Sequence, residues 1–80
     1  MIELMTERSK YIKRTPDGKQ HYVVQLVADT CAELAGVTEL NGIAFDFGSL
    51  AFCGKDGEVC SLMSDSKWYK VSDGSEVTGA

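Results

Sequence analysis

Apolar residues recur at every second position from Tyr22 to Leu26. A period of two is typical of a β-strand with one buried face. The Pro-Asp-Gly sequence at residues 16–18 precedes this segment and is a turn signal, because proline presets a turn dihedral and glycine accepts the left-handed conformation. The pattern predicts a hairpin over residues 8–27, closed either by residues 17–18 alone or by all three residues with a bulge.

The apolar period changes after residue 28. Thr30 is followed three residues later by Glu33, which forms a capping box, and Gly36 lies where a helix would end. These signals predict one or two helical turns over residues 31–35. Because a helix this short has no stability of its own, we expect its apolar side chains to hold it against a sheet.

Residues 43–47 return to a period of two after an Asn-Gly turn signal at 41–42. A strand here places Ile43, Phe45 and Phe47 on one face. Large apolar side chains in alternation are rarely left in water. This face belongs either to the core or to a contact with another chain.

The segment from residue 48 to residue 71 predicts a meander of three antiparallel strands. Its first turn centres on the Asp-Gly pair at 56–57, and its second on residues 64–67. The last strand begins at Trp68, with Tyr69 on the opposite face. Trp68 is the largest apolar group available to close a small core, so we favour core or protomer contacts for this pair over a carbohydrate or peptide platform.

The charges beside the first meander turn suggest its register. A two-residue loop sets Lys55 opposite Glu58 and Cys53 opposite Cys60. An opposite-charge pair across two strands stabilises the hairpin, which supports this register. Both cysteines then share a face with Ala51 and Leu62.

These elements together predict a mainly β fold (β-rich α+β). It consists of an N-terminal hairpin, one short helix and a C-terminal three-stranded antiparallel meander. We expect a single domain over residues 1–80, with flexible tails at 1–7 and 72–80.

The composition fits one small globular domain of 80 residues, 44% of them apolar and 25% charged. A core of this size supplies only about 3–5 kcal/mol of net stability, and such chains often rely on a disulfide, a metal or a partner chain. We therefore expect a homo-oligomer.

No apolar run reaches the roughly 20 residues that span a bilayer, and the first ten residues do not resemble a secretion signal. We expect synthesis in the cytoplasm and no membrane partner.

The net charge of −4 is unevenly distributed, with +2 in residues 1–20 and −6 in the rest. A basic ribbon can bind phosphate, but charges at scattered strand positions are more often a solvated face, so we do not expect nucleic acid as the partner. A head-to-tail contact between protomers uses the same asymmetry. The candidate residues for such an electrostatic contact are Arg8, Lys10, Lys13, Arg14 and Lys19.

The three cysteines do not have the spacing of a zinc site, which needs about four ligands in close pairs. They are 22 and 7 residues apart, and His21 is the one histidine. They could bind a metal only if the fold gathered them from three elements. A Cys53–Cys60 disulfide is sterically conceivable between facing strands, but the odd cysteine count and a reducing compartment argue against it. We expect buried thiols, no metal and no cofactor.

No catalytic residue is expected either. A cysteine nucleophile needs a base within hydrogen-bond reach, and only His21 could serve. The strand pattern places His21 on the face opposite the apolar residues. The chain is therefore predicted not to be an enzyme.

Residues 22–71 resemble a loose class of short proteins encoded in the structural-gene regions of tailed bacteriophages and prophages. The shared pattern is YVVQLVADTCAEL, then GSLAFC, a turn, GEVCSL, and an acidic turn before a tryptophan in SDSKWYKV. The class often carries an aromatic residue where this chain has Cys60. The resemblance implies a small β-rich virion component, such as a head decoration, head-fibre or tail accessory protein. It implies no catalytic residues.

We therefore expect a non-enzymatic phage or prophage structural protein. It would be made in the bacterial cytoplasm and located in the virion, with itself and other virion proteins as partners. The alternative is a small cytoplasmic binding module made by a prophage, acting on a host protein or nucleic acid through the basic N-terminal hairpin. The residues expected at an interface are Phe45, Phe47, Phe52, Trp68 and Tyr69.

Overall fold

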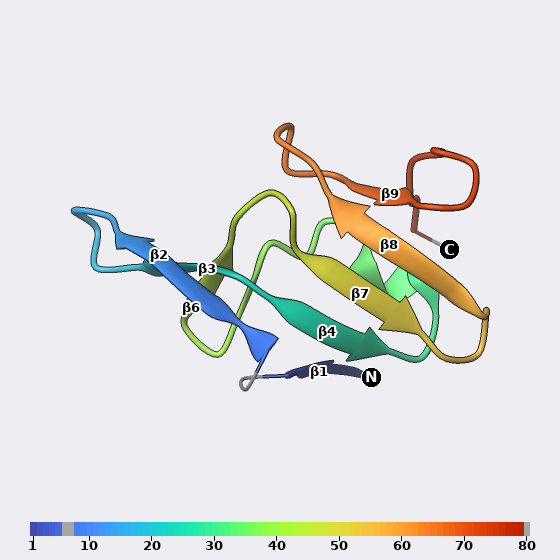
Figure 1. Ribbon diagram of the computed structural model, residues 1–80, viewed down its shortest axis with the longest axis horizontal. Helices are drawn as coiled ribbons and strands as arrows, with labels where there is room; N and C mark the ends of the chain where they lie inside the picture. The colour runs from blue at the N-terminus through green and yellow to red at the C-terminus, as the bar shows by residue number, and fades with distance from the viewer. Residues whose placement is uncertain (6–7, 80) are drawn as a thin grey trace.

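The computed structural model describes residues 1–5 and 8–79, and within them the chain forms nine strands and one short 3-10 helix (Figure 1). The predicted mainly β class is confirmed. None of the helical structure in these residues is long and apolar enough to cross a membrane. The elements are β1 (Ile2–Leu4), β2 (Lys10–Arg14), β3 (Gln20–Val23), β4 (Gln25–Ala28), η2 (Cys31–Leu34), β5 (Glu39–Leu40), β6 (Ile43–Phe45), β7 (Leu50–Cys53), β8 (Glu58–Leu62) and β9 (Trp68–Lys70).

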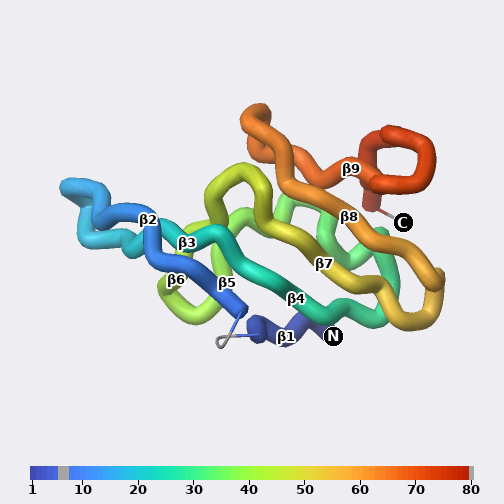
Figure 2. The backbone as a smooth tube through the Cα atoms, in the orientation of Figure 1, coloured from blue at the N-terminus to red at the C-terminus, as the bar shows by residue number. Residues whose placement is uncertain are grey.

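The strands form two sheets that share one stretch of chain. The five-stranded sheet has the order β1-β4-β7-β8-β9, and the four-stranded sheet has the order β2-β3-β6-β5. Only Val24 separates β3 from β4, so one segment runs from the four-stranded sheet into the five-stranded sheet, as the tube in Figure 2 shows. Each sheet contains one parallel pair, β3 with β6 and β4 with β7. The sequence pattern predicted antiparallel pairing in the hairpin and in the meander, and neither of these parallel pairs.

A buried serine lies where the chain changes sheets. Ser49 is fully buried just before β7, and its Oγ accepts the N–H of Val24 at 3.0 Å. The same hydroxyl donates to the carbonyl oxygen of Asp46 at 2.7 Å. Buried backbone groups need hydrogen-bond partners, and this side chain supplies one to each strand that ends here.

The N-terminal hairpin pairs β2 with β3, with a register shift between Tyr11 and Lys13. Its loop is closed by the N–H of Thr15, which donates to the carbonyl oxygen of Lys19 at 2.9 Å. Gly18 has a φ of 88°. Of the two loops left open by the sequence, this is the longer one, residues 16–18, where a left-handed residue follows a turn.

The predicted register of the first meander turn is wrong. Cys53 lies opposite Glu58, and Cys60 lies opposite Ala51, so the loop is four residues long. The reason is that β4 continues its hydrogen bonding beyond the end of β7: the N–H groups at 54 and 55 donate to the carbonyl oxygens at 28 and 29, at 2.9 Å each. These residues are thus unavailable to a tight turn, and the predicted Lys55–Glu58 strand pair does not form.

The helical segment is a four-residue 3-10 helix, one residue shorter than predicted. Glu33 receives the N–H of Thr30 at 3.3 Å and that of Asp29 at 3.1 Å on Oε2. Cys31 and Leu34 are both buried, as a short helix without intrinsic stability requires.

The core lies on the inner face of the five-stranded sheet, around Trp68. The indole Nε1 donates to the carbonyl oxygen of Val37 at 2.8 Å, and the Phe45 ring packs edge-on at 6.4 Å between centroids. The buried residues of this cluster are Val24, Leu26, Ala28, Cys31, Leu34, Phe45, Ala51, Cys53, Cys60, Leu62, Trp68 and Val77.

Both ends of the chain carry structure where the sequence analysis expected tails. Strand β1 pairs with β4 from Ile2 to Leu4, and Val77 is buried in the core. The N–H of Val77 donates to the carbonyl oxygen of Trp68 at 2.8 Å. Residues 6, 7 and 80 of those expected tails lie outside the described residues.

Candidate functional site

The outer face of the five-stranded sheet, opposite the core, carries a row of apolar side chains. The register sets Val27 opposite Phe52, and Phe52 opposite Val59. Val71 continues the row, because its N–H donates to the carbonyl oxygen of Val59 at 2.9 Å. We call Val27, Phe52, Val59 and Val71 the outer row.

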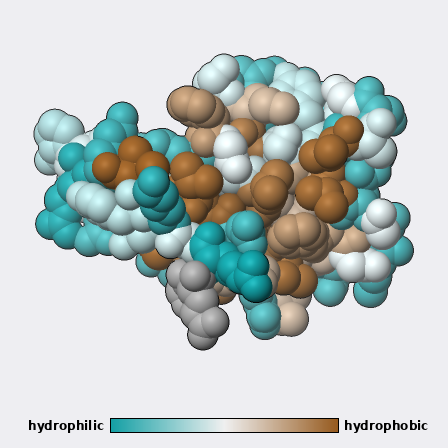
Figure 3. Space-filling model, viewed as in Figure 1, coloured by the Kyte–Doolittle hydropathy of each residue, from teal (hydrophilic) through white to brown (hydrophobic). Residues whose placement is uncertain are grey.

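Three of the four residues of the outer row are open to water: Val27 is 43% exposed, Phe52 40% and Val71 60%. Val59, between Phe52 and Val71, is half-buried. Figure 3 shows apolar side chains gathered over β4, β7 and β8 on this face. Single exposed apolar residues are ordinary, whereas a contiguous patch marks a binding surface. The arrangement is therefore suited to binding an apolar surface.

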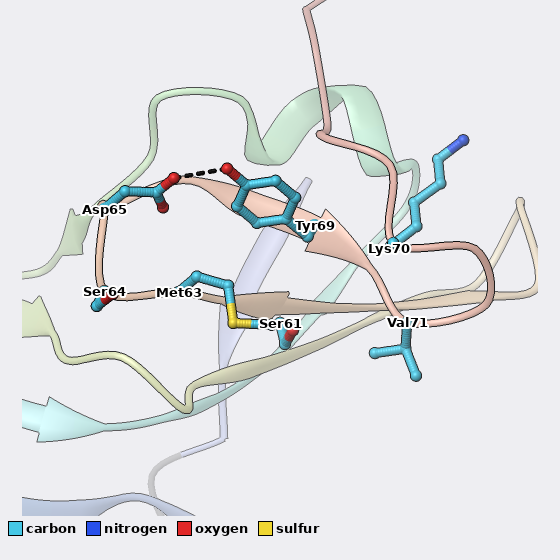
Figure 4. Close-up of a pocket in the computed structure, with 8 residues that line it drawn as sticks. Ser61, Met63, Ser64, Asp65, Tyr69, Lys70 and Val71 are labelled. Atoms are coloured by element: carbon cyan, nitrogen blue, oxygen red, sulfur yellow. Dashed lines mark hydrogen bonds between the residues drawn. The ribbon is translucent and has the colours of Figure 1, made fainter.

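A hollow of about 540 Å³ adjoins the outer row between β8 and β9. Met63, Ser61 and Val71 lie along one side of it, and Lys70 extends away from them (Figure 4). Its lining residues are Ser61, Met63, Ser64, Asp65, Tyr69, Lys70, Val71 and Gly74.

One charged hydrogen bond fixes the rim of this hollow. The Tyr69 hydroxyl donates to Asp65 Oδ2 at 2.5 Å (Figure 4). This bond favours the ionised carboxylate, so it lowers the pKa of Asp65 and raises the pKa of Tyr69. The hollow therefore has an ionised carboxylate, Asp65, at its rim, next to the apolar side chains of Met63 and Val71.

The structure separates the five residues expected at an interface. Phe45 and Trp68 are only 7% and 1% exposed and pack in the protein's own core, so they cannot contact a partner without opening it. Phe52 lies in the outer row, and Tyr69 lines the hollow. Phe47 is exposed in the loop after β6, beyond the strand in which it was expected.

The valines of the outer row were not among the residues expected at an interface. Val27 stands in a run that is apolar at neighbouring positions, YVVQLVA, so the run supplies apolar groups to both faces of its strand. That excess over strict alternation is the signal that could have identified a second apolar surface.

The basic residues lie on the projecting hairpin at one end of the molecule (Figure 1). All five residues of β2 are exposed, among them Lys10, Lys13 and Arg14. Arg8 is also exposed, just before the strand. Lys19 instead pairs with Glu39, with 2.7 Å between Nζ and Oε2.

The fold brings the three cysteines together, which the sequence spacing did not predict. The Sγ atoms of Cys60 and Cys31 are 3.5 Å apart, and those of Cys53 and Cys60 are 3.9 Å apart. Burial raises the pKa of Cys53 to about 12 and also raises that of Cys60. His21 is not part of this group: its Nδ1 lies 3.2 Å from Asp46 Oδ1.

This thiol arrangement does not resemble a nucleophilic site. An activated cysteine has a lowered pKa beside a base, and burial here acts in the opposite direction. The thiols can act as soft metal ligands or as small apolar groups.

Comparison of the chain with protein-family models, with curated proteins and with solved structures gave no match.

Proposed function

We propose that this chain is a non-enzymatic assembly protein that binds a second copy of itself through the outer row. The observation that supports this proposal is the alignment of Val27, Phe52 and Val59 across three hydrogen-bonded strands, on a face that the core does not use. Packing two such faces together removes a continuous apolar surface from water, which is the main driving force of association.

For the five-stranded sheet, a face-to-face contact is favoured over edge-to-edge strand addition. The outer edge of β9 is already occupied, because Tyr69 bridges to Glu76 and the Lys70 N–H donates to the carbonyl oxygen of Ser75 at 2.8 Å. The opposite edge of this sheet is β1, which is only three residues long. Short or covered edges are poor templates for another strand.

A second copy is favoured over an unrelated partner by the small size of the core. An 80-residue chain gains little net stability from its own interior, and a symmetric dimer supplies the missing apolar burial with the same patch twice. Paired sheets pack about 10 Å apart with their side chains interdigitated, so valines and one phenylalanine form a suitable layer.

The solution mass tests this proposal, measured by light scattering on a sizing column with reductant at low and high salt. We expect a dimer or larger assembly that resists salt, because its contact is apolar. Val27→Lys should dissociate it by placing a charge in the contact. Ile12→Lys is the matched control, since Ile12 lies on the other sheet and is 42% exposed. A monomeric wild type at micromolar concentrations, or equal dissociation by both variants, would contradict the proposal.

We also propose a location for this assembly protein. It would be a component of the virion, as a head decoration, head-fibre or tail accessory protein. Its support is the resemblance of residues 22–71 to short phage structural proteins. Mass spectrometry of gradient-purified phage particles, from a host that carries the gene, tests this part separately. We expect a fixed copy number per particle. Intact particles without the protein would remove the virion from the proposal while leaving the dimer to its own test.

A second candidate function is nucleic-acid or host-protein binding through the β2–β3 hairpin. The observation that favours it is that every residue of β2 is exposed, including Tyr11 at 51%. Cations beside an exposed aromatic ring fit a nucleic-acid backbone and base. Binding of a labelled oligonucleotide should then weaken steeply with salt and be lost in Lys10→Glu/Lys13→Glu. Absence of binding at low salt would exclude nucleic acid as the partner.

A further inference from the structure

Three thiols converge from three separate elements of the fold. Cys31 opens η2, Cys53 ends β7 and Cys60 lies inside β8. Their Sγ atoms all lie within 4.8 Å of one another, and all three residues are buried. No two of them are joined by a disulfide.

The spacing of these sulfur atoms matches a metal–thiolate site. A Zn–S bond is about 2.3 Å long, so two sulfurs on a tetrahedral ion lie roughly 3.8 Å apart. The two sulfur–sulfur distances that involve Cys60 are 3.5 and 3.9 Å. The third pair, Cys31 and Cys53, lies within the same limit of 4.8 Å.

A disulfide between the two strand cysteines is disfavoured by the strand register. Cys53 and Cys60 are diagonal neighbours, because each lies opposite a different residue of the other strand. Diagonal Cα atoms are roughly 7–8 Å apart, beyond the usual reach of a disulfide. The two thiols therefore lie on one face without forming a disulfide. Thiols that bind the same metal ion are placed in this way.

The surroundings of the cluster supply an oxygen donor and a positive charge. The Cys31 N–H donates to Asp56 Oδ2 at 2.8 Å, which brings this carboxylate from the β7–β8 loop to the edge of the cluster. Lys70 lies opposite Cys60 in the β8–β9 register. A cation nearby offsets the excess negative charge that three thiolates and a carboxylate leave on a divalent ion.

We propose that Cys31, Cys53 and Cys60 bind one Zn²⁺ ion as thiolates, with Asp56 supplying the fourth donor. As three Zn–S bonds form, three S–H bonds break and their protons pass to water, with no change of oxidation state. Thiolates select soft or borderline ions, and a closed four-ligand set is typical of a structural zinc site. The ion ties η2 to β7 and β8, which gives the four-residue helix an anchor that it cannot provide for itself.

Zn²⁺ and Co²⁺ titrations of reduced, metal-free protein test this assignment. We expect one equivalent of Co²⁺ to produce thiolate charge-transfer and tetrahedral d–d absorption, and Zn²⁺ to displace it. Saturating Zn²⁺ should protect the cysteines from a thiol reagent and raise the melting temperature by at least about 5 °C. Thiols that stay equally reactive, with an unchanged melting temperature and no Co²⁺ spectrum, would overturn the proposal.

Variants then test each ligand. Cys60→Ala should abolish the Co²⁺ spectrum. Asp56→Asn should weaken zinc binding at least about 10-fold, as the loss of one donor requires. Asp73→Asn is the matched control, since Asp73 also precedes a glycine with positive φ in an exposed turn. Equal zinc affinity of the two Asn variants would remove Asp56 from the site. If Cys60→Ala does not fold, the wild-type titration and the exposed Asp56→Asn variant still decide the question.

Discussion

The Ser49 hydroxyl and the Val24 N–H form a 3.0 Å hydrogen bond between the end of the β6–β7 connection and the single residue that separates β3 from β4. Ser49 is the one polar residue among the fully buried side chains of the described chain. The bond therefore lies at the point where both sheets and both of their parallel pairs meet.

Replacing Ser49 with alanine should lower the free energy of unfolding by about 1–3 kcal/mol, because the N–H of Val24 loses its buried partner and the Asp46 carbonyl keeps only the Ser49 N–H. Urea denaturation measures the change. Ser64→Ala, at an exposed turn position, is the control and should shift stability by less than about 0.5 kcal/mol. Equal stability of the two variants would mean that a water replaces the hydroxyl at no cost.

Trp68→Phe should also destabilise the protein, by about 1–3 kcal/mol. The substitution removes the indole N–H that donates to the Val37 carbonyl and leaves a void beside Phe45. Thermal and urea unfolding, followed by circular dichroism, measure the loss. Tyr11→Phe, on the exposed hairpin, provides an aromatic control that should unfold like the wild type.

Tyr69→Phe should raise the pKa of Asp65, because the hydroxyl that favours the ionised carboxylate is removed. A carboxyl whose folded pKa is lowered adds stability above its unfolded pKa and loses it as pH falls through the folded value. The stability gap between wild type and Tyr69→Phe should therefore be present at neutral pH and close in acid. An NMR titration of the Asp65 carboxyl carbon measures the shift, and Ser72→Ala, which removes the hydrogen bond to Glu58 instead, should leave it unchanged.

In the metal-free protein, all three cysteines should react with a thiol reagent on the order of 100-fold more slowly than in urea. Each is buried, and a raised pKa keeps Cys53 and Cys60 protonated at neutral pH. A kinetic trace with one fast phase would show that one thiol is accessible, contrary to the packing described above.

The sequence predicted where several strands lie better than it predicted their partners. Cys53 and Cys60 share the inner face as expected, although their register is shifted, because a shift of two positions leaves every side chain on its own face. The parallel pairing of β4 with β7 had no signal, since alternation identifies a buried face but does not specify the neighbouring strand.

The same limit applies to the sites. Spacing rules find metal ligands that are close in the chain, whereas Cys31 meets Cys60 only through the tertiary fold. The sequence left Trp68 suited either to the core or to an interface, and its 1% exposure and its hydrogen bond to Val37 assign it to the core. The apolar excess of the run YVVQLVA indicates a second apolar face on β4, but the outer row also depends on the register of neighbouring strands, which the residues around Val27 and Phe52 do not specify.

The passage of one segment through both sheets also has a consequence for how the chain folds as it is synthesised. The hydrogen-bond partner of the Val24 N–H lies 25 residues further along the chain, and the β4–β7 pair cannot form until the ribosome has released the chain as far as Cys53. The β2–β3 hairpin can form earlier in synthesis, but an isolated hairpin without further strands to pack against is only marginally stable. Contacts over such separations delay folding, and we expect a time constant of milliseconds to seconds rather than the microseconds of a helical bundle of similar size. Until then Leu26 and Val27 of β4 are exposed to neighbouring chains, and folding yield should fall as the expression rate rises.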